Sequence, residues 1–350
     1  MWKYCVFIAI TMVQLRAADS TGVHWWLTAS GYASAYSSDE GSQPFHDLVT
    51  TAPRSGVGGN MIAGSVSATY GVLYGALTLQ AGDVPTVVWQ PAFPYVQEAW
   101  LGLHLRDDVR LEAGAFISHL GVESMIPFEN LMGIISIAGF LDPNFFAGAK
   151  LYWDVSPTVT VHADVLTSYS GFQYEGSIPA FCASMMWTAD STLSVYVNSM
   201  VSDEPLTRGT QFQSYTNVYA EYTTSDFHAL AEFNVGCELP TADHGAYPMT
   251  SAQLTVFHSI LPTLALGVRG EIILDPHGIM ANDRYPAPLP ITMLNAAGVT
   301  GSLQFRPNKW SRIGFDLRRV EALDDTSIVD VDPNISARTE AVLSLDVFLR

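Results

Sequence analysis

The sequence predicts an all-β fold, a transmembrane antiparallel β-barrel of about sixteen strands within a range of about 14–18. In the C-terminal three quarters, segments of roughly ten residues alternate apolar and polar residues one for one. Short turns follow alternate segments, and long loops follow the others. The chain is 48% hydrophobic and only 14% charged, yet no apolar run of about 18 residues, the length of a membrane helix, follows the first twenty positions.

The alternation is clearest in two segments, VRLEAGAF at Val109–Phe116 and TVTVHADV at Thr158–Val165. In the second segment the valines and the alanine fall on one face, while Thr160, His162 and Asp164 fall on the other. Successive side chains of a strand point to opposite faces, so each segment has one apolar and one polar side. This pattern is typical of a barrel with lipid outside and water inside.

The candidate strands account for most of the chain after its first twenty residues. The glycine-rich stretch Gly56–Gly59 has no strand–helix context and is interpreted as a flexible loop, not a phosphate-binding one. The predicted strands are 23–36, 61–68, 72–81, 95–105, 109–116, 144–153, 158–167, 178–188, 192–201, 214–223, 227–236, 249–260, 263–273, 295–305, 312–320 and 335–349.

The connections between these strands alternate in length. Turn-forming Asp, Pro, Ser and Asn residues occupy the short ones, including 106–108, 154–157, 224–226 and 306–309. The long connections include 202–213, 238–248, 274–290 and 321–334. A one-sided distribution of this kind matches short periplasmic turns and long extracellular loops, and an even strand count returns both termini to the periplasmic side.

The N-terminus has the features of a signal peptide, with Lys3 before an apolar core at Cys5–Leu15. We therefore expect residues 1–18 to be removed and residues 19–350 to form a single barrel domain; a buried N-terminal strand or helix is the alternative.

Cys182 and Cys237 lie on strands separated by two others. We expect both to be free thiols.

Strand parity predicts which side chains face lipid. In the strand at 312–320, Ile313, Phe315 and Leu317 share one face. Charges there would cost about 2–4 kcal/mol each near the bilayer midplane, and almost every strand charge falls on the opposite parity. Aromatic residues near strand ends suit interfacial girdles; these are Trp25, Trp100, Trp153, Trp187, Tyr215 and Trp310.

The opposite parity predicts the residues of the lumen. A barrel of about sixteen strands encloses an aqueous space, whereas about eight strands would be filled by side chains. The inward residues are mostly polar and small, with charges of both signs, which describes a wet channel. The candidate lumen residues are Arg110, Glu112, Lys150, His162, Asp164, Glu232, Arg269, Glu271, Arg312, Asp316, Arg338 and Glu340.

The connection Ile117–Pro143 is unusually long and apolar for an extracellular loop. Its apolar side chains need a surface to pack against, and the barrel interior offers one. Folded inward, the loop would narrow the pore; a helix capping the outer rim, or a contact between protomers, is the alternative. The polar residues that it would present to the pore are His119, Glu123, Glu129 and Asn130.

The stretch from Gln97 to Ser170 resembles the outer-membrane β-barrel porins of the BBP2, OmpL-like group. The matching segments are Gln97–Trp100, Ala113–Phe116, Gly121–Glu123 and the hairpin from Phe146 to Gly171. The chain also resembles general sixteen-stranded porins, in which the constricting loop joins the fifth and sixth strands. The resemblance implies a bacterial outer-membrane channel. The C-terminus departs from the usual aromatic ending, because Leu349 and Arg350 follow Phe348.

The charge balance excludes nucleic acid as a partner. The net charge is −18, and removal of residues 1–18 makes it −20, whereas nucleic-acid binding requires a basic surface. The expected mouth loops are acidic and favour cations. Their acids include Asp39, Glu40, Asp203, Glu204, Asp324, Asp325, Asp330 and Asp332, against a few bases such as Arg54, Arg208 and Arg284.

The sequence thus predicts a porin for passive diffusion of small hydrophilic solutes, with a modest preference for cations. The alternatives are a substrate-selective outer-membrane channel or transporter, and a structural or adhesin barrel on the cell surface. The expected partners are outer-membrane lipid, small solutes and cations, with a homotrimer as one assembly state. Without a nucleophile elbow, HExxH motif or Cys/His cluster, no enzyme activity, cofactor or metal is expected.

Overall fold

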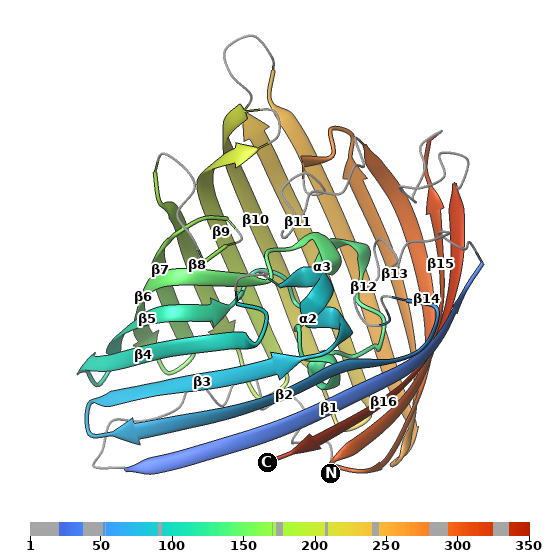
Figure 1. The fold of residues 1–350 in the computed structure, drawn as a ribbon, viewed down its shortest axis with the longest axis horizontal. Helices are drawn as coiled ribbons and strands as arrows, with labels where there is room; N and C mark the ends of the chain where they lie inside the picture. Colours follow the sequence, from blue (N-terminus) through green and yellow to red (C-terminus); the bar gives the residue numbers. More distant parts are fainter. Residues whose placement is uncertain are drawn as a thin grey trace.

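The protein is a closed barrel of sixteen antiparallel strands, seen from the side in Figure 1. The structure is a computed structural model. It describes residues 21–37, 52, 54–89, 93–169, 171–172, 178–206, 209–239, 245–279, 293–324 and 336–350. The predicted fold class is confirmed, and each of the sixteen predicted segments overlaps one of the strands. The predicted signal peptide lies outside the described residues.

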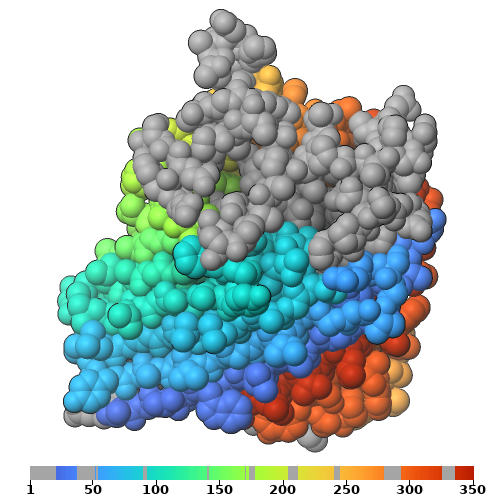
Figure 2. Space-filling model, in the orientation of Figure 1, coloured from blue at the N-terminus to red at the C-terminus, as the bar shows by residue number. Residues whose placement is uncertain are grey.

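Every strand pairs with its neighbours in chain order, and β1 (Gly22–Tyr36) pairs with β16 (Ala337–Leu349) to close the barrel. In Figure 2 the blue N-terminal strands lie directly against the red C-terminal ones. Closure leaves no sheet edge whose unpaired backbone groups would face lipid. The strands between are β2 (Gly56–Tyr70), β3 (Leu73–Ala81), β4 (Val96–Arg106), β5 (Val109–Ile117), β6 (Phe145–Ser156), β7 (Val159–Leu166), β8 (Ala180–Thr188), β9 (Leu193–Leu206), β10 (Gly209–Thr223), β11 (Phe227–Leu239), β12 (Tyr247–Leu261), β13 (Leu264–Asp275), β14 (Leu294–Asn308) and β15 (Ser311–Ala322).

The two rims of the barrel differ, as the sequence predicts. At one rim the hairpins close over short turns, such as Asp107–Asp108 between β4 and β5 and Pro262–Thr263 between β12 and β13. The start of β1 and the end of β16 lie at this same rim, because the two strands are antiparallel. Most connections at the other rim are longer.

Two predicted loops are strands instead. β9 and β10 continue their pairing as far as Leu206 and Gly209, so residues 202–206 and 209–213 extend a hairpin. β2 likewise begins at Gly56, where a flexible loop is predicted, and its glycines pair with β1. In both places backbone pairing continues beyond the region where lipid and water impose alternation. The residue pattern therefore disappears before the strand does.

Strand parity separates the two faces of the wall. On β15, Leu317 is 49% exposed on the outer face, whereas its neighbour Arg318 is 0% exposed on the inner one. The same alternation holds along β11 and β13, where Phe233 and Val268 face outward and Glu232 and Arg269 inward. The predicted faces of these strands are confirmed. Tyr215 is a correction to the predicted girdle, because it is buried inside and donates a hydrogen bond to Asp142.

The segments inside the barrel are the short helix α2 (Asp83–Val88), a 3-10 turn η1 (Pro127–Glu129) and the helix α3 (Ile137–Leu141). Figure 1 draws α2 and α3 within the outline of the barrel. Trp89 after α2 packs on Phe145 at the start of β6, with ring centroids 4.5 Å apart. None of the helices in the described part of the chain has the length and apolarity of a membrane span.

The candidate pore site

The connection between β5 and β6 lies against the luminal side of the wall formed by β13, β15 and β16. The backbone N–H groups of Gly133 and Ile134 donate to one carboxylate oxygen of Asp316, at 2.7 and 3.1 Å. The N–H of Ile137, the first residue of α3, donates to Glu271 at 2.6 Å. The loop therefore has an interior position, which its apolar composition predicts. Asp316 and Glu271 are candidate lumen residues that hold its backbone.

Arg269 on β13 is one of the candidate residues that join loop and wall. It forms an ion pair of 2.9 Å with Glu123 of the loop and donates to the carbonyl of Ile134 at 2.9 Å. Its distance to Glu271 on the same strand is 3.7 Å. A guanidinium has five donors, so one side chain can satisfy an acid and a carbonyl together.

Arg312 and Arg318 on β15 repeat this arrangement. Arg312 pairs with Asp346 on β16 at 2.8 Å and donates to the carbonyls of Pro127 and Asn130. Arg318 pairs with Glu340 on β16 at 2.7 Å and donates to the carbonyl of Ile135 at 2.9 Å. The three arginines are at most 1% exposed. Removing one of them would leave a buried acid without its main partner.

Arg338 and Glu340 lie next to this row on β16. Arg338 pairs with Glu340 at 2.8 Å, so Glu340 serves two guanidinium groups. Arg110 and Glu112 lie elsewhere, on β5. Arg110 pairs with Asp154 at 2.9 Å, and Glu112 accepts a hydrogen bond of 2.8 Å from Tyr74. Arg110 and Glu112 are therefore in a different part of the wall from Arg338 and Glu340.

Glu232 on β11 is the centre of a third group of luminal hydrogen bonds. It accepts hydrogen bonds of 2.6 Å from the amide groups of Asn217 and Gln253 on the neighbouring strands. The backbone N–H of Val122 in the loop also donates to it, at 3.2 Å. Glu232 therefore holds the first part of the loop much as Asp316 holds the middle.

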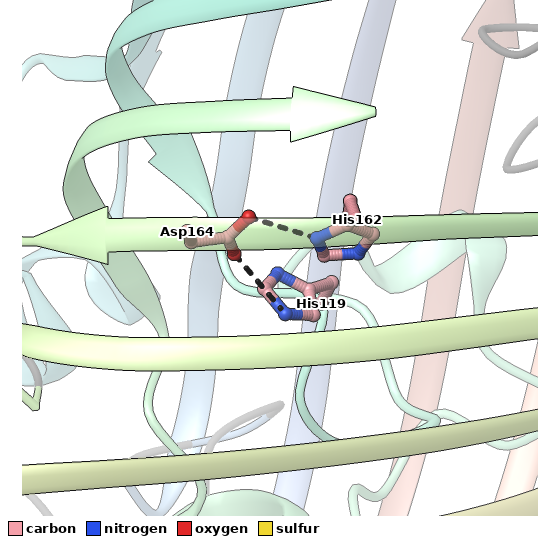
Figure 3. A group of neighbouring side chains, drawn as sticks. All are labelled: His119, His162 and Asp164. Carbon is pink, nitrogen blue, oxygen red and sulfur yellow. Dashed lines mark hydrogen bonds and ion pairs between the residues drawn. The ribbon is translucent and has the colours of Figure 1, made fainter. Parts of the chain in front are cut away.

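A fourth group contains the loop residue His119 and two residues of β7, His162 and Asp164 (Figure 3). Nδ1 of His162 lies 2.8 Å from one oxygen of Asp164, and Nε2 of His119 lies 3.6 Å from the other. Nζ of Lys150 on β6 is 3.4 Å from Nδ1 of His119 and 4.4 Å from the ring centroid of Phe116. Burial first, and then Lys150 and His162, hold the pKa of His119 well below its ordinary value.

The remaining loop candidates face a cavity between the loop and β10–β13. Its empty space is about 730 Å³, part of it open solvent, and its lining includes Glu123, Glu129, Asn130 and Arg269. Asn130 also braces the loop, since its amide oxygen accepts from the N–H of Ser124 at 2.7 Å. Desolvation raises the pKa of Glu129 to about 7. The lining residues are thus mostly polar, with several acids among them.

Some residues of the site were not predicted from the sequence. Asp346 pairs with Arg312, Glu221 lines the cavity, and Gln253 supports Glu232. Strand parity could have found Asp346, which alternates with Leu345 and Val347. Gln253 carries no charge, so nothing in the pattern separates it from other inward polar residues. Both described cysteines, Cys182 and Cys237, are free thiols.

Comparison with sequence families gives one decisive result. The family described as "Putative beta-barrel porin-2, OmpL-like" (BBP2) matches residues 26–350. The chain belongs to this family. Family and fold together place this protein in the bacterial outer membrane, with its short turns toward the periplasm. No curated protein sequence matches the chain at a significant level.

Solved structures with a similar fold include outer-membrane proteins. The outer membrane channel DcaP of Acinetobacter baumannii is similar with a TM-score of 0.64 at 11% identity, covering 96% of this chain and 100% of its own. An anion-selective porin from Comamonas acidovorans gives 0.65 at 9% identity, covering 94% and 100%. OmpT of Vibrio cholerae, in its trimer form, gives 0.62 at 11%, covering 95% and 100%. At these identities the likeness establishes only the fold of this chain.

Proposed function

We propose that the protein is a non-enzymatic, water-filled channel for passive diffusion of small hydrophilic solutes. The observation that supports this most is the cavity between the inward loop and the β10–β13 wall, lined by polar and charged side chains inside a closed barrel. Purified protein in planar bilayers should give stepwise single-channel currents. A folded barrel that gives none would favour the structural or adhesin alternative.

The loop Ile117–Pro143 is the proposed constriction of this channel. Deleting Glu123–Ile134 removes the side of the cavity that the loop provides, so single-channel conductance should rise. Asp316→Ala is a milder form of the test, because it removes the carboxylate that holds Gly133 and Ile134. The matched control is Asp154→Ala, whose carboxylate pairs with Arg110 of the wall instead.

Each variant should be checked for slower gel migration after boiling, which marks a folded barrel before heating. Conductance that stays unchanged in folded deletion and Asp316→Ala variants would place the constriction elsewhere. A rise in the Asp154→Ala control as large as in Asp316→Ala would mean that any lost lumen charge widens the pore.

The charges around the cavity are the basis on which we propose a modest preference for cations. Glu123, Glu129 and Glu221 line it, and Arg269 is already paired with Glu123. Of the acidic mouth residues, Asp203 and Asp324 are described in the structure. Glu204 lies on β9 without a described side chain, and Asp39, Glu40, Asp325, Asp330 and Asp332 lie outside the described residues. Acidic rings concentrate cations at a pore entrance.

Reversal potentials across a KCl gradient test this selectivity. The cation preference should be larger near 0.1 M than near 1 M salt, because the Debye length falls from about 10 to about 3 Å. Anion selectivity at low salt would mean that the lumen arginines control permeation. Such a result would make this chain similar in selectivity to the anion-selective porin from Comamonas acidovorans.

Two further features are proposed for the mature protein. Residues 1–18 are removed during export, so N-terminal sequencing of the outer-membrane form should begin at Asp19.

The barrel assembles as a homotrimer, supported by the trimer form of the structurally similar Vibrio cholerae protein. Sedimentation in detergent should give three chains per particle, and a single-chain particle would contradict this assembly.

A further inference from the structure

Three side chains that could bind a metal converge between the loop and the wall, as Figure 3 shows. His119, His162 and Asp164 can each place one ligand atom so that all three lie within 4.8 Å of one another. Asp164 lies to one side of the two imidazoles, whose ring centroids are 4.5 Å apart, and turns one carboxylate oxygen toward each. His119 comes from the loop and the other two from β7, so the group forms only when the loop is inside.

One carboxylate oxygen of the group lacks a hydrogen-bond partner. Oδ2 of Asp164 is buried and has no hydrogen-bond partner among the described residues. The side chain of Asp164 is 0% exposed, and Nε2 of His119, 3.6 Å away, is too far to donate a hydrogen bond. Buried carboxylate oxygens are generally satisfied by donors or cations, because desolvation without a partner is costly. The position next to Oδ2 therefore suits a bound cation.

Cys182 on β8 is a further candidate ligand beside His119, although it is not one of the three residues whose ligand atoms all lie within 4.8 Å of one another. Sγ of Cys182 on β8 is 3.2 Å from Nε2 of His119. Tetrahedral zinc with bonds of about 2.0–2.3 Å places neighbouring ligand atoms about 3.3–3.8 Å apart. The separations from Nε2 to Sγ and to Oδ2 are close to these values. Imidazole, thiolate and carboxylate together are a ligand set typical of zinc, and of neither magnesium nor calcium.

We propose that His119, His162, Asp164 and Cys182 form a binding site for a divalent transition metal ion of the zinc type. The imidazole side chains keep 19% and 12% exposure, so an ion in the lumen can reach them. Binding releases the thiol proton of Cys182 to solvent, since the thiolate is the metal ligand. The ion ties the loop to β7 and β8.

The positive charge of Lys150 opposes the binding of a metal ion at this site. Its Nζ lies 3.4 Å from Nδ1 of His119, and its backbone is opposite Asp164 in register on one side and Glu112 on the other. With a metal on Nε2, the proton of the His119 ring is on Nδ1, so Lys150 must turn away, toward Glu112. A zinc ion on Nε2 and the ammonium group of Lys150 next to Nδ1 therefore repel each other across the His119 ring.

The test is zinc titration of the refolded full-length protein in detergent, in competition with a chromophoric chelator. One ion per chain should bind, and Co²⁺ should give a visible tetrahedral spectrum with a thiolate charge-transfer band. His119→Ala and Asp164→Asn should each lower the zinc affinity at least about tenfold. Lys150→Met should raise it, an outcome that misfolding cannot produce. His258→Ala, on the outer face of β12, is the matched control.

Three results would overturn the site. The first is no stoichiometric zinc binding by a barrel that is folded by its gel migration. The second is equal loss of affinity in His119→Ala and His258→Ala. The third is a cobalt spectrum whose charge-transfer band is absent, or survives in Cys182→Ser.

Discussion

Glu129 is the loop residue whose ionisation falls near neutral pH. Desolvation is the main cause that raises its pKa to about 7; the Ser124 hydroxyl lowers it and the charge of Glu98 raises it further. Its cavity also contains Glu123, Glu221, His228 and Arg269. A raised carboxyl pKa means that Glu129 is neutral below pH 7 and negative above it. The same shift makes the folded state less stable as pH rises from about 4.5 to about 7.

The predicted consequence is a selectivity that depends on pH. Raising the pH from 6 to 8 should strengthen the cation preference, because Glu129 gains its charge at the cavity. Glu129→Gln should reduce this change and leave the low-pH selectivity as it is; part of the change remains, because Glu221 also lines the cavity. Reversal potentials at both pH values measure the effect. The control is Glu321→Gln, because Glu321 is an exposed partner of Arg319. If the selectivity of Glu129→Gln depended on pH as strongly as that of the unchanged protein, the effect would belong to another group.

At the scale of elements, a pair of glycines shapes the hairpin that carries the loop. Gly114 on β5 and Gly148 on β6 are directly opposite in register. Their φ angles are 145° and 153°, a region that side chains rarely adopt. A Cβ on Gly148 would lie 2.1 Å from the carbonyl oxygen of Val165, and one on Gly114 would lie 2.3 Å from that of Ala99.

Gly148→Ala should therefore destabilise the barrel by about 1–3 kcal/mol, the range for a strained backbone position. The control is Gly301→Ala on β14, where an added Cβ meets no atom within 4 Å. Urea midpoints of unfolding from lipid vesicles compare the two. Equal midpoints would show that β6 adjusts without strain.

The strands were largely predictable because lipid and water impose a period of two on every residue of the wall. That constraint is absent inside the loop and beyond the membrane, so α2 and the extended β9–β10 hairpin were not predicted. The inward loop follows from its apolar composition, but its contact with Asp316 spans 183 residues and depends on the register of many strands. The grouping of His119 with Cys182 depends on register in the same way.

At the scale of the whole molecule, the outer face of the wall is rich in exposed apolar side chains, and depth in the membrane sets the cost of changing one of them. Leu303 on β14 is 42% exposed on this face, between Leu266 and Phe315 of the neighbouring strands. Leu73 is also on this face, but it begins β3 directly after a turn.

Leu303→Lys should cost about 2–4 kcal/mol, and Leu73→Lys about 0–1 kcal/mol, because a charge near the rim reaches water. Folding free energies in lipid vesicles give both values. A cost for Leu73→Lys equal to that for Leu303→Lys would contradict the depth that the short-turn rim assigns to the membrane boundary.

The partners of the inward loop also set an order of assembly. Much of its anchorage comes from Arg269, Glu271, Asp316 and Arg318, residues of β13 and β15 near the end of the chain. A chain that has formed only its first twelve strands has none of these four groups to offer. The apolar segment between β5 and β6 then lacks these four anchors until the last strands arrive. Protease resistance of that segment would thus report completion of the barrel, and a C-terminal truncation before β13 would leave it open to cleavage.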